Sequence, residues 1–336
     1  LLTGCSQLET PPEDEDILFP LEEQADTTEA TALPEVFSLP YLSTQPLNPL
    51  ACPDGMQQTV ASLLYEGLFH LDTALAPQPV LCASYTYDAE ALTYTLTLRP
   101  NAVFSDGSPL TAADVKTTLT AAKASPRYSE RLTDLKSVSG SGSTVTLTLN
   151  RANSALPALL DIPILKSGTE KQDIPIGTGP YVVTENVLGQ YCVIERNDNY
   201  WGTPGIAKTF RFKVIPDAET RYTALRAGEV QGLCDLGAIS PSQAAEIDGD
   251  PAYNVSVGDS GITHFLNVNG GAFPFNDVRM REGLSLLLDR QTIIDSFYNG
   301  YGLAAGGFLN YTSAFYREQP VQHDPERGAE LIREVV

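Results

Sequence analysis

Two segments that alternate threonine with large apolar residues constrain the fold of this chain more than any other feature. Residues 93–98 read TYTLTL and residues 145–149 read VTLTL. Successive side chains of a strand point to opposite faces, so a period of two predicts strands. An Asp-Ala-Glu turn makes residues 85–98 a hairpin, and a Gly/Ser turn at 139–143 precedes the second strand. The chain therefore contains β-hairpins.

Helical and strand patterns are interspersed along the rest of the chain, without the regular alternation of βαβ units. Strands are predicted at 36–39, 191–196, 209–215 and 263–268, and a tight turn at 177–181 leads into another. Helices are predicted at 57–70 (Val60, Leu63, Leu64 and Leu68 on one stripe), after a capping box at Thr111–Asp114, at 221–227 before Gly228, and at 278–288 (Val278, Leu284, Leu287 and Leu288 inward). We expect a mixed α/β (α+β) fold.

The first 35 residues differ in composition from the rest. The chain begins Leu1-Leu2-Thr3-Gly4-Cys5, which looks like the cleavage site of a lipoprotein signal peptide, and an acidic stretch rich in Ser, Thr and Pro follows. Such a stretch buries too little apolar surface to fold, so it predicts an extended tether. We expect lipid on Cys5 to hold the protein at the membrane. The alternative is a disordered acidic tail with an incidental cysteine.

The formal charge of −21 is concentrated near the N-terminus. Residues 1–98 contain 15 acidic and no basic side chains, and the first basic residue is Arg99. An acidic chain without clustered Lys and Arg is a poor partner for nucleic acid, because phosphate contacts require such clusters. The chain has no run of eighteen or more apolar residues, so no membrane span is predicted. The acidity is interpreted as a source of solubility rather than as a cation site.

The sequence does not favour an enzyme. Its three histidines, His70, His264 and His323, have no metal-ligand spacing, and neither a GxSxG elbow nor a Walker loop is present. We expect no catalytic residue, no metal and no cofactor. The cysteines after Cys5 form no CxxC motif and are expected to be small buried side chains, with disulfide pairing left open: Cys52, Cys82, Cys192 and Cys234.

A collinear series of motifs from about residue 36 onward resembles the extracellular solute-binding proteins of family 5, the oligopeptide, dipeptide and nickel class. Any one of the motifs is weak, and it is their shared order that indicates the family. They are Leu47-Asn48-Pro49, Tyr65-Glu66-Gly67-Leu68, Leu98-Arg99-Pro100 with Phe104, Asp106 and Gly107, Leu110-Thr111-Ala112 with Asp114 and Val115, Gly177–Tyr181, Glu195-Arg196-Asn197 with Tyr200-Trp201-Gly202, and Phe275 through Arg281 to Leu288-Asp289-Arg290.

The resemblance implies a periplasmic-binding-protein-like fold of two lobes that close on a ligand by hinge motion. Lobe I maps to 36–66 with 175–261, a β-rich insert to 67–174, and lobe II, incomplete at the C-terminus, to 262–336. Two departures from the family pattern are Gln231, where the family has Asp, and Gly283, where it has Ala. Gly283 is expected to cost up to about 1 kcal/mol in helix propensity.

The function implied is capture of peptides for an ABC importer, outside the cytoplasm, by a monomer that meets permease and ATPase subunits. The location is the outer face of the bacterial cytoplasmic membrane or the periplasm. Two alternatives stay open. One is a nickel, metal-chelate or other small-solute binding protein of the same fold, and the other is a peptide-sensing surface receptor without transport.

The resemblance also implies a set of ligand-binding residues. The positions after Leu-x-Pro point to Cys52, Pro53 and Asp54, and the tyrosine after Ser-Pro in the insert points to Tyr128. The strand at the crossing between lobes points to Phe265 and Asn267. Each has a structural alternative: Asp54 begins a common Asp-Gly turn, Tyr128 could close the insert, and Asn267 could serve the backbone. Trp201, the one tryptophan, is expected to pack in the core.

Overall fold

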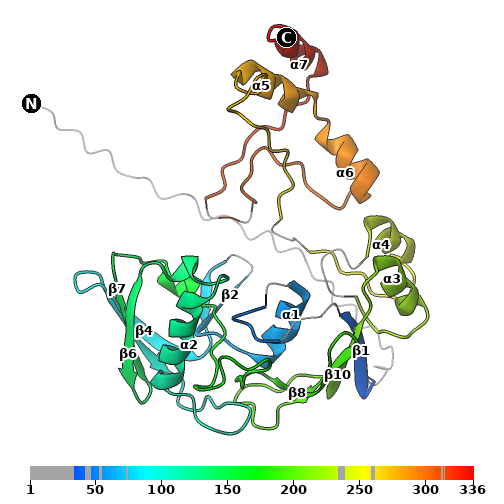
Figure 1. Cartoon of the computed structure of the whole chain (residues 1–336). Coiled ribbons are helices and arrows are strands. Elements are labelled where there is room, and N and C mark those ends of the chain that lie inside the picture. The colour runs from blue at the N-terminus through cyan, green and yellow to red at the C-terminus, as the bar shows by residue number, and fades with distance from the viewer. Residues whose placement is uncertain are drawn as a thin grey trace, which may run out of the picture. The chain divides into compact units, whose positions relative to one another are not determined.

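The computed structural model describes residues 34–41, 47–52, 55–72, 75–233, 239–258, 262–311, 313 and 315–336 (Figure 1). Residues 1–33, which include Cys5 and most of the tether, lie outside these residues, as do the candidate ligand residues Pro53 and Asp54, and Cys234. Among the described residues no helix is long and apolar enough to cross a bilayer. Residues from 34 onward cluster as one compact unit.

The first four-stranded sheet joins distant parts of the chain. Its order is β1 (Val36–Tyr41), β10 (Thr209–Val214), β9 (Tyr191–Arg196) and β8 (Tyr181–Val187). β1 runs parallel to β10, and the other pairs are antiparallel. Gln231, the departure from the family pattern, ties β1 down, because its side-chain oxygen accepts from the Ser38 amide at 2.7 Å. The strands predicted at 36–39, 191–196 and 209–215 are confirmed.

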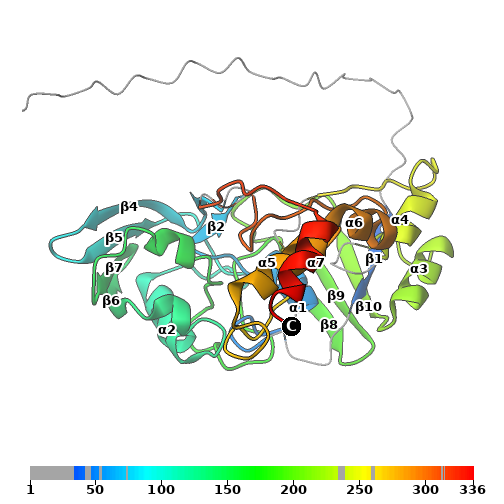
Figure 2. The ribbon, with the colours of Figure 1, turned by 90° about the horizontal axis from the view of Figure 1, so that it is seen from above.

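The second four-stranded sheet contains the alternating segments. Its order is β4 (Cys82–Asp88), β5 (Thr93–Leu98), β7 (Thr144–Leu149) and β6 (Leu135–Ser141), all antiparallel, and Figure 2 shows it separate from the first sheet. The apolar residues of β5 and β7 are buried and their threonines lie on the other face, as the period of two predicts. Helix α2 (Ala112–Ala124) contacts β6 and β7, and it begins with the predicted capping box.

The helix predicted over 57–70 is shorter than expected. Helix α1 spans Gly55–Leu64, and the chain then turns into β2 (Phe69–Leu71), which pairs with β3 (Pro77–Pro79). The physical reason lies at Gly67, where a Cβ would stand 2.8 Å from the Phe69 carbonyl oxygen and 3.0 Å from backbone of Asp161. The backbone must therefore approach its neighbours more closely than a helix with side chains allows.

In the described part of the chain, five helices follow β10, and two short 3-10 turns come before β8. The 3-10 turns are Glu130–Leu132 and Leu156–Leu159, and the helices are α3 (Ala218–Arg226), α4 (Pro241–Ile247), α5 (Val278–Leu287), α6 (Arg290–Tyr298) and α7 (Pro325–Arg333). The strand predicted at 263–268 is wrong. No strand of the described chain pairs with this segment, and the adjacent Phe265 and Leu266 are both exposed, so no face is buried to stabilise one.

The inward face predicted for α5 is also wrong. Its buried residues are Met280, Gly283 and Leu286, while Val278 is exposed. Gly283 explains the shift, because a Cβ there would lie 2.8 Å from the carbonyl oxygen of Gly328 in α7. The two helices meet at this point, so the face of α5 that carries Gly283 is buried instead of the predicted leucine stripe.

Candidate ligand-binding surface

A closed turn places Cys52, the one described candidate after the Leu-x-Pro motif. The Asn48 side chain donates to the carbonyls of Glu170 (2.7 Å) and Gln172 (2.8 Å), and its oxygen accepts from the Leu50 amide at 3.0 Å. The Asn48 carbonyl accepts from the Cys52 amide at 2.9 Å. All hydrogen-bonding groups of the buried Asn48 side chain are thus engaged in shaping residues 47–52, which explains an asparagine in this motif.

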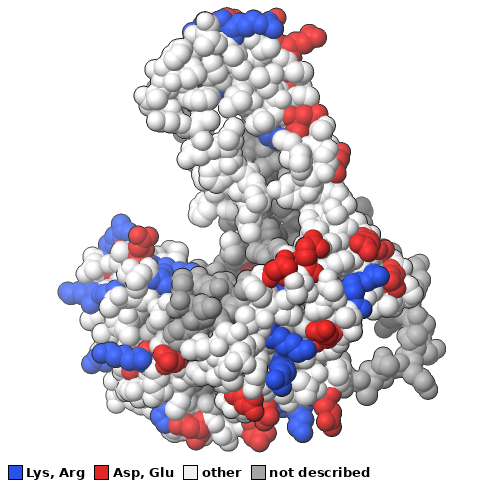
Figure 3. All heavy atoms as spheres, turned by 45° about the vertical axis from the view of Figure 1, so that its right-hand side comes forward, with Lys and Arg blue, Asp and Glu red and all other residues white. Residues whose placement is uncertain are grey.

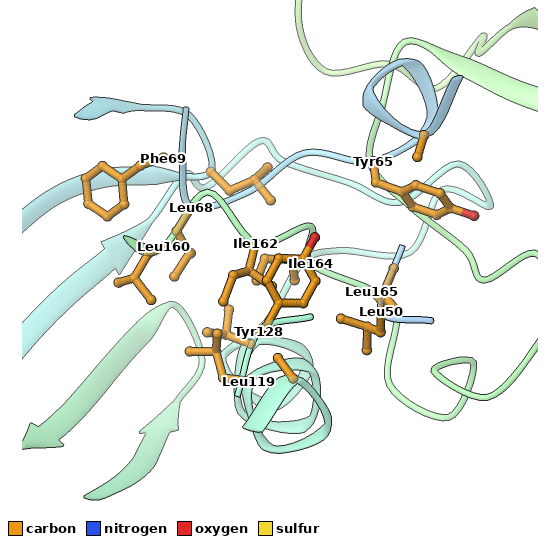
Figure 4. Packing of buried hydrophobic residues seen from close by; sticks show 14 of the residues in the cluster. Leu50, Tyr65, Leu68, Phe69, Leu119, Tyr128, Leu160, Ile162, Ile164 and Leu165 are labelled. Carbon is orange, nitrogen blue, oxygen red and sulfur yellow. The ribbon is translucent and has the colours of Figure 1, made fainter. Parts of the chain in front are cut away.

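Tyr128 lies in the interior of the insert. It is 4% exposed and belongs to the main apolar cluster, and Figure 4 shows it with Ile162 and Ile164. The guanidinium carbons of Arg127 and Arg131 lie 5.1 and 5.5 Å from its ring centroid. Burial raises the pKa of Tyr128, against the opposing effect of the Arg127 charge. The phenol is therefore a neutral group beside two cations, and a ligand could reach little of its ring.

Arg127 brings Cys52 and Tyr128 together. Its guanidinium donates to the Cys52 carbonyl at 3.4 Å while it lies over the Tyr128 ring. The neighbouring Ser125 hydroxyl donates to the Leu50 carbonyl at 2.6 Å and joins the same two segments. The Arg127 Nε is buried and has no hydrogen-bond partner among the described residues. The Nε is thus closed off, but the residue is partly exposed, and a guanidinium binds a carboxylate with the best geometry of any side chain.

A groove of about 650 Å³ lies beside this turn. Its lining includes the small or apolar side chains of Leu50, Ala51, Ala121 and Ala124, and the remaining lining residues are polar or charged: Asn48, Lys116, Thr117, Thr120, Ser125, Glu170 and Lys171. Two ammonium groups and one carboxylate suit a small zwitterionic or anionic solute with an apolar portion. Elsewhere, on the face shown in Figure 3, acidic and basic side chains are interspersed rather than gathered by sign.

Phe265 and Asn267 stand apart from this cluster. Phe265 is 71% exposed and Asn267 is exposed, in a segment without regular structure. Among the described residues, nothing joins either side chain to Cys52, Arg127 or Tyr128. Their role in ligand binding stays a prediction, as do the roles of Cys52 and Tyr128.

The sequence alone does not single out Arg127. The available signal was its position directly before Tyr128. However, an arginine beside a candidate tyrosine is common, and only the fold shows that it reaches the Cys52 carbonyl, 75 residues earlier.

The possible metal ligands of the described residues are dispersed, and the thiols of Cys82 and Cys192 are buried. The described residues contain no group of three or more His, Cys, Asp or Glu side chains that could hold a metal ion. Cys82 and Cys192 are buried, and burial raises the pKa of their thiols to about 11 and about 12. Neutral thiols are poor nucleophiles, because the thiolate is the reactive form.

The sequence motifs meet around Glu66. Its carboxylate accepts from the Tyr200 hydroxyl and from the Trp201 indole, each at 2.8 Å. The Arg99 guanidinium lies 5.5 Å from the Trp201 ring centroid. Gly177 packs so closely that a Cβ would stand 2.3 Å from the Leu64 carbonyl oxygen. Motifs distant in sequence thus form one structural junction, and the half-buried Trp201 packs against the main apolar cluster.

Comparison with known proteins identifies the family. The family model of bacterial extracellular solute-binding proteins, family 5 Middle, matches residues 76–335. The glutathione-binding protein GsiB of Salmonella typhi is 29% identical over 304 residues. This alignment covers 86% of the chain but 59% of GsiB, so the chain spans less than two thirds of that relative's length.

Solved structures agree with this family. NikA from Brucella suis in complex with Fe(III)-EDTA superposes with a TM-score of 0.80 at 26% identity, covering 89% of this chain and 64% of NikA. AppA from Bacillus subtilis in complex with a nonapeptide superposes with a TM-score of 0.70 at 23% identity over 89% of this chain and 63% of AppA, a likeness of fold. The predicted mixed α/β fold of the two-lobed periplasmic binding proteins is confirmed. The chain belongs to the bacterial extracellular solute-binding proteins of family 5.

Proposed function

We propose that this chain captures a peptide or peptide-like solute outside the cytoplasm and delivers it to an ABC importer. Residues 36–66 with 175–261 would form lobe I, 67–174 its insert and 262–336 part of lobe II. The protein would work as a monomer with permease and ATPase subunits, held at the membrane by lipid on Cys5. It would act as a receptor and not as an enzyme.

One observation carries this proposal: the partly exposed Arg127 contacts both the Cys52 carbonyl and the Tyr128 ring, two of the candidate ligand residues. A carboxylate of the solute would accept from this guanidinium. The Lys116 and Lys171 side chains that line the neighbouring groove would favour the same negative end. Charge-assisted hydrogen bonds of this kind are about twice as strong as neutral ones.

A metal chelate is the second candidate. The Brucella suis neighbour is described in complex with Fe(III)-EDTA, a chelate rich in carboxylates. The cations of the groove would meet such groups in the same way as the carboxylate of a peptide. A peptide-sensing surface receptor without transport would use the same site and would differ in lacking a permease partner.

Native mass spectrometry of the purified protein tests the proposal. We expect adducts with the masses of short peptides or of glutathione, released on denaturation. Adducts that contain nickel or iron would favour the chelate. A chemically altered product formed from an added peptide would contradict a receptor, and so would the absence of binding to glutathione, tri-alanine and nickel–histidine by thermal shift.

A further inference from the structure

The carboxylate of Glu66 is bound from both sides by one short turn of the chain. Oε1 accepts from Tyr200 and Oε2 from Trp201, each at 2.8 Å, and Tyr200 and Trp201 are adjacent after β9. Burial raises the pKa of Glu66, while these two donors and the charge of Arg99 oppose that shift. The side chain of Glu66 therefore fixes the residue against the 197–202 turn.

The backbone at Glu66 holds a different segment. Its carbonyl accepts from the Ile164 amide at 2.8 Å, and Gly67 forms an antiparallel bridge with Pro163. At Gly67 the chain passes so close to Asp161 that a Cβ would lie 3.0 Å from its carbonyl carbon. A movement of Glu66 would therefore displace the backbone of residues 161–164.

Asp161 begins a row of contacts that ends at the candidate ligand-binding surface. Its carboxylate pairs with Arg131 at 2.5 Å. The Arg131 guanidinium lies 5.5 Å from the centroid of the Tyr128 ring, and the Arg127 guanidinium lies 5.1 Å from the same centroid. Arg127 then donates to the Cys52 carbonyl. Each contact leads to the next without a gap.

We propose that Glu66 is a positioning residue for ligand binding: it holds residues 161–164 in place and, through Asp161, Arg131 and Tyr128, sets the position of Arg127 beside Cys52. Glu66 itself touches no ligand. This inference rests on the proposed function for its effect on affinity, but the row of contacts exists in the ligand-free protein and can be tested there.

Two substitutions separate the hydrogen bonds of Glu66 from its bulk. Glu66→Leu keeps a side chain of similar size but leaves the Tyr200 and Trp201 donors unmatched. Glu66→Gln offers an oxygen to the indole and an N–H to the phenol oxygen, so it should restore the geometry without the charge. Asp217→Ala is the matched control, since it removes the N-cap of α3, whose carboxylate accepts from the Glu219 and Thr220 amides.

Hydrogen exchange of the ligand-free protein is the first readout. Glu66→Leu should speed exchange of the Ile164 amide and of the Cys52 amide, which donates to Asn48 at 2.9 Å. Glu66→Gln should largely restore the slow exchange, and Asp217→Ala should leave both amides as in the wild type. If Glu66→Leu does not fold, Trp201→Phe, which removes one donor and keeps an aromatic ring, should act in the same direction. Unchanged protection at Cys52 would overturn the inference.

Affinity is the second readout, measured by calorimetry with glutathione and tri-alanine. For the probe that binds the wild type, Glu66→Leu should lower the affinity about tenfold, as expected for a displaced guanidinium. Glu66→Gln should lower this affinity far less. Failure of the wild type to bind either probe would count against the proposed function, with the exchange result still deciding on Glu66. Wild-type affinity in Glu66→Leu would overturn the positioning role alone.

Discussion

Gly283 of α5 and Gly328 of α7 meet backbone to backbone: a Cβ added to either would lie 2.8 Å from the carbonyl oxygen of the other. This contact reverses the expectation that Gly283 is an unfavourable departure from alanine. The glycine lets two helices approach at a distance that any side chain would prevent. Gly328 also sits beneath Leu286 and Leu287, so the crossing is packed on both sides of the glycine pair.

Gly283→Ala should therefore destabilise the protein even though alanine favours helix. Overpacking of a tight contact costs about 1–3 kcal/mol, which outweighs a propensity gain of up to about 1 kcal/mol. The free energy of unfolding in urea measures the difference. Gly307→Ala, in a position with no atom within 4 Å of the added Cβ, is the control and should change little. Greater stability of Gly283→Ala would show that the helices can separate freely.

Asp106 should make the protein lose stability at acid pH. Burial alone would raise the pKa of this carboxyl, but hydrogen bonds from Lys166 and Ser108 lower it to about 2 from its usual 3.8. A group whose pKa is depressed by folding stabilises the protein above its unfolded pKa, and this contribution is lost as pH falls from about 4 toward 2. Thermal melting across this range should show a shallower decline in Asp106→Asn. Identical slopes for the two proteins would contradict the ion pair with Lys166.

The capping box of α2 predicts a second stability effect. Asp114 accepts from the Thr111 amide at 2.9 Å through one oxygen and from the Ser167 amide at 2.9 Å through the other. Asp114→Ala leaves both donors unmatched and should cost about 1–3 kcal/mol in unfolding free energy. Asp88→Ala, which removes acceptors from an exposed turn, should cost less. Equal losses in the two variants would show that Asp114 does no more than cap a turn.

The buried thiols should resist alkylation. The raised pKa of Cys82 and Cys192 keeps both neutral at pH 8, and both side chains are fully buried. Iodoacetamide followed by peptide mapping should label these two positions slowly in the native protein and rapidly in urea. Fast native labelling of Cys192 would mean that the first sheet opens readily around β9.

The sequence predicts the two central strands of the second sheet, β5 and β7, well because each has one buried and one solvent-facing side. The edge strands β4 and β6 are mostly exposed and lack this pattern, and β6 takes up part of the segment predicted as a Gly/Ser turn at 139–143. Tyr94, Leu96 and Leu98 alternate with threonines, and this local pattern alone determines which side is buried. The capping box at Thr111 is equally local. The family motifs were also recognisable, since they are short and ordered along the chain.

Features that depend on distant backbone could not be predicted. The end of α1 at Leu64 follows from the closeness of Gly67 to Asp161, and the buried face of α5 follows from Gly328. Arg127 becomes a candidate ligand residue only because it donates to the Cys52 carbonyl, which lies 75 residues away in sequence. Local sequence patterns cannot predict these contacts, because they form only when segments distant in sequence meet in the fold.

Calorimetric titration of the protein with glutathione, tri-alanine and nickel–histidine, for wild type, Arg127→Gln and Arg226→Gln, tests the central claim most directly. Arg226 also lies over a tyrosine ring, 5.6 Å from the centroid of Tyr253, so it is a matched control. We predict saturable binding by the wild type and by Arg226→Gln, with affinity lowered about tenfold or more in Arg127→Gln, as for loss of a charge-assisted contact. Equal binding by all three proteins, or none by the wild type, would contradict a solute receptor built around Arg127.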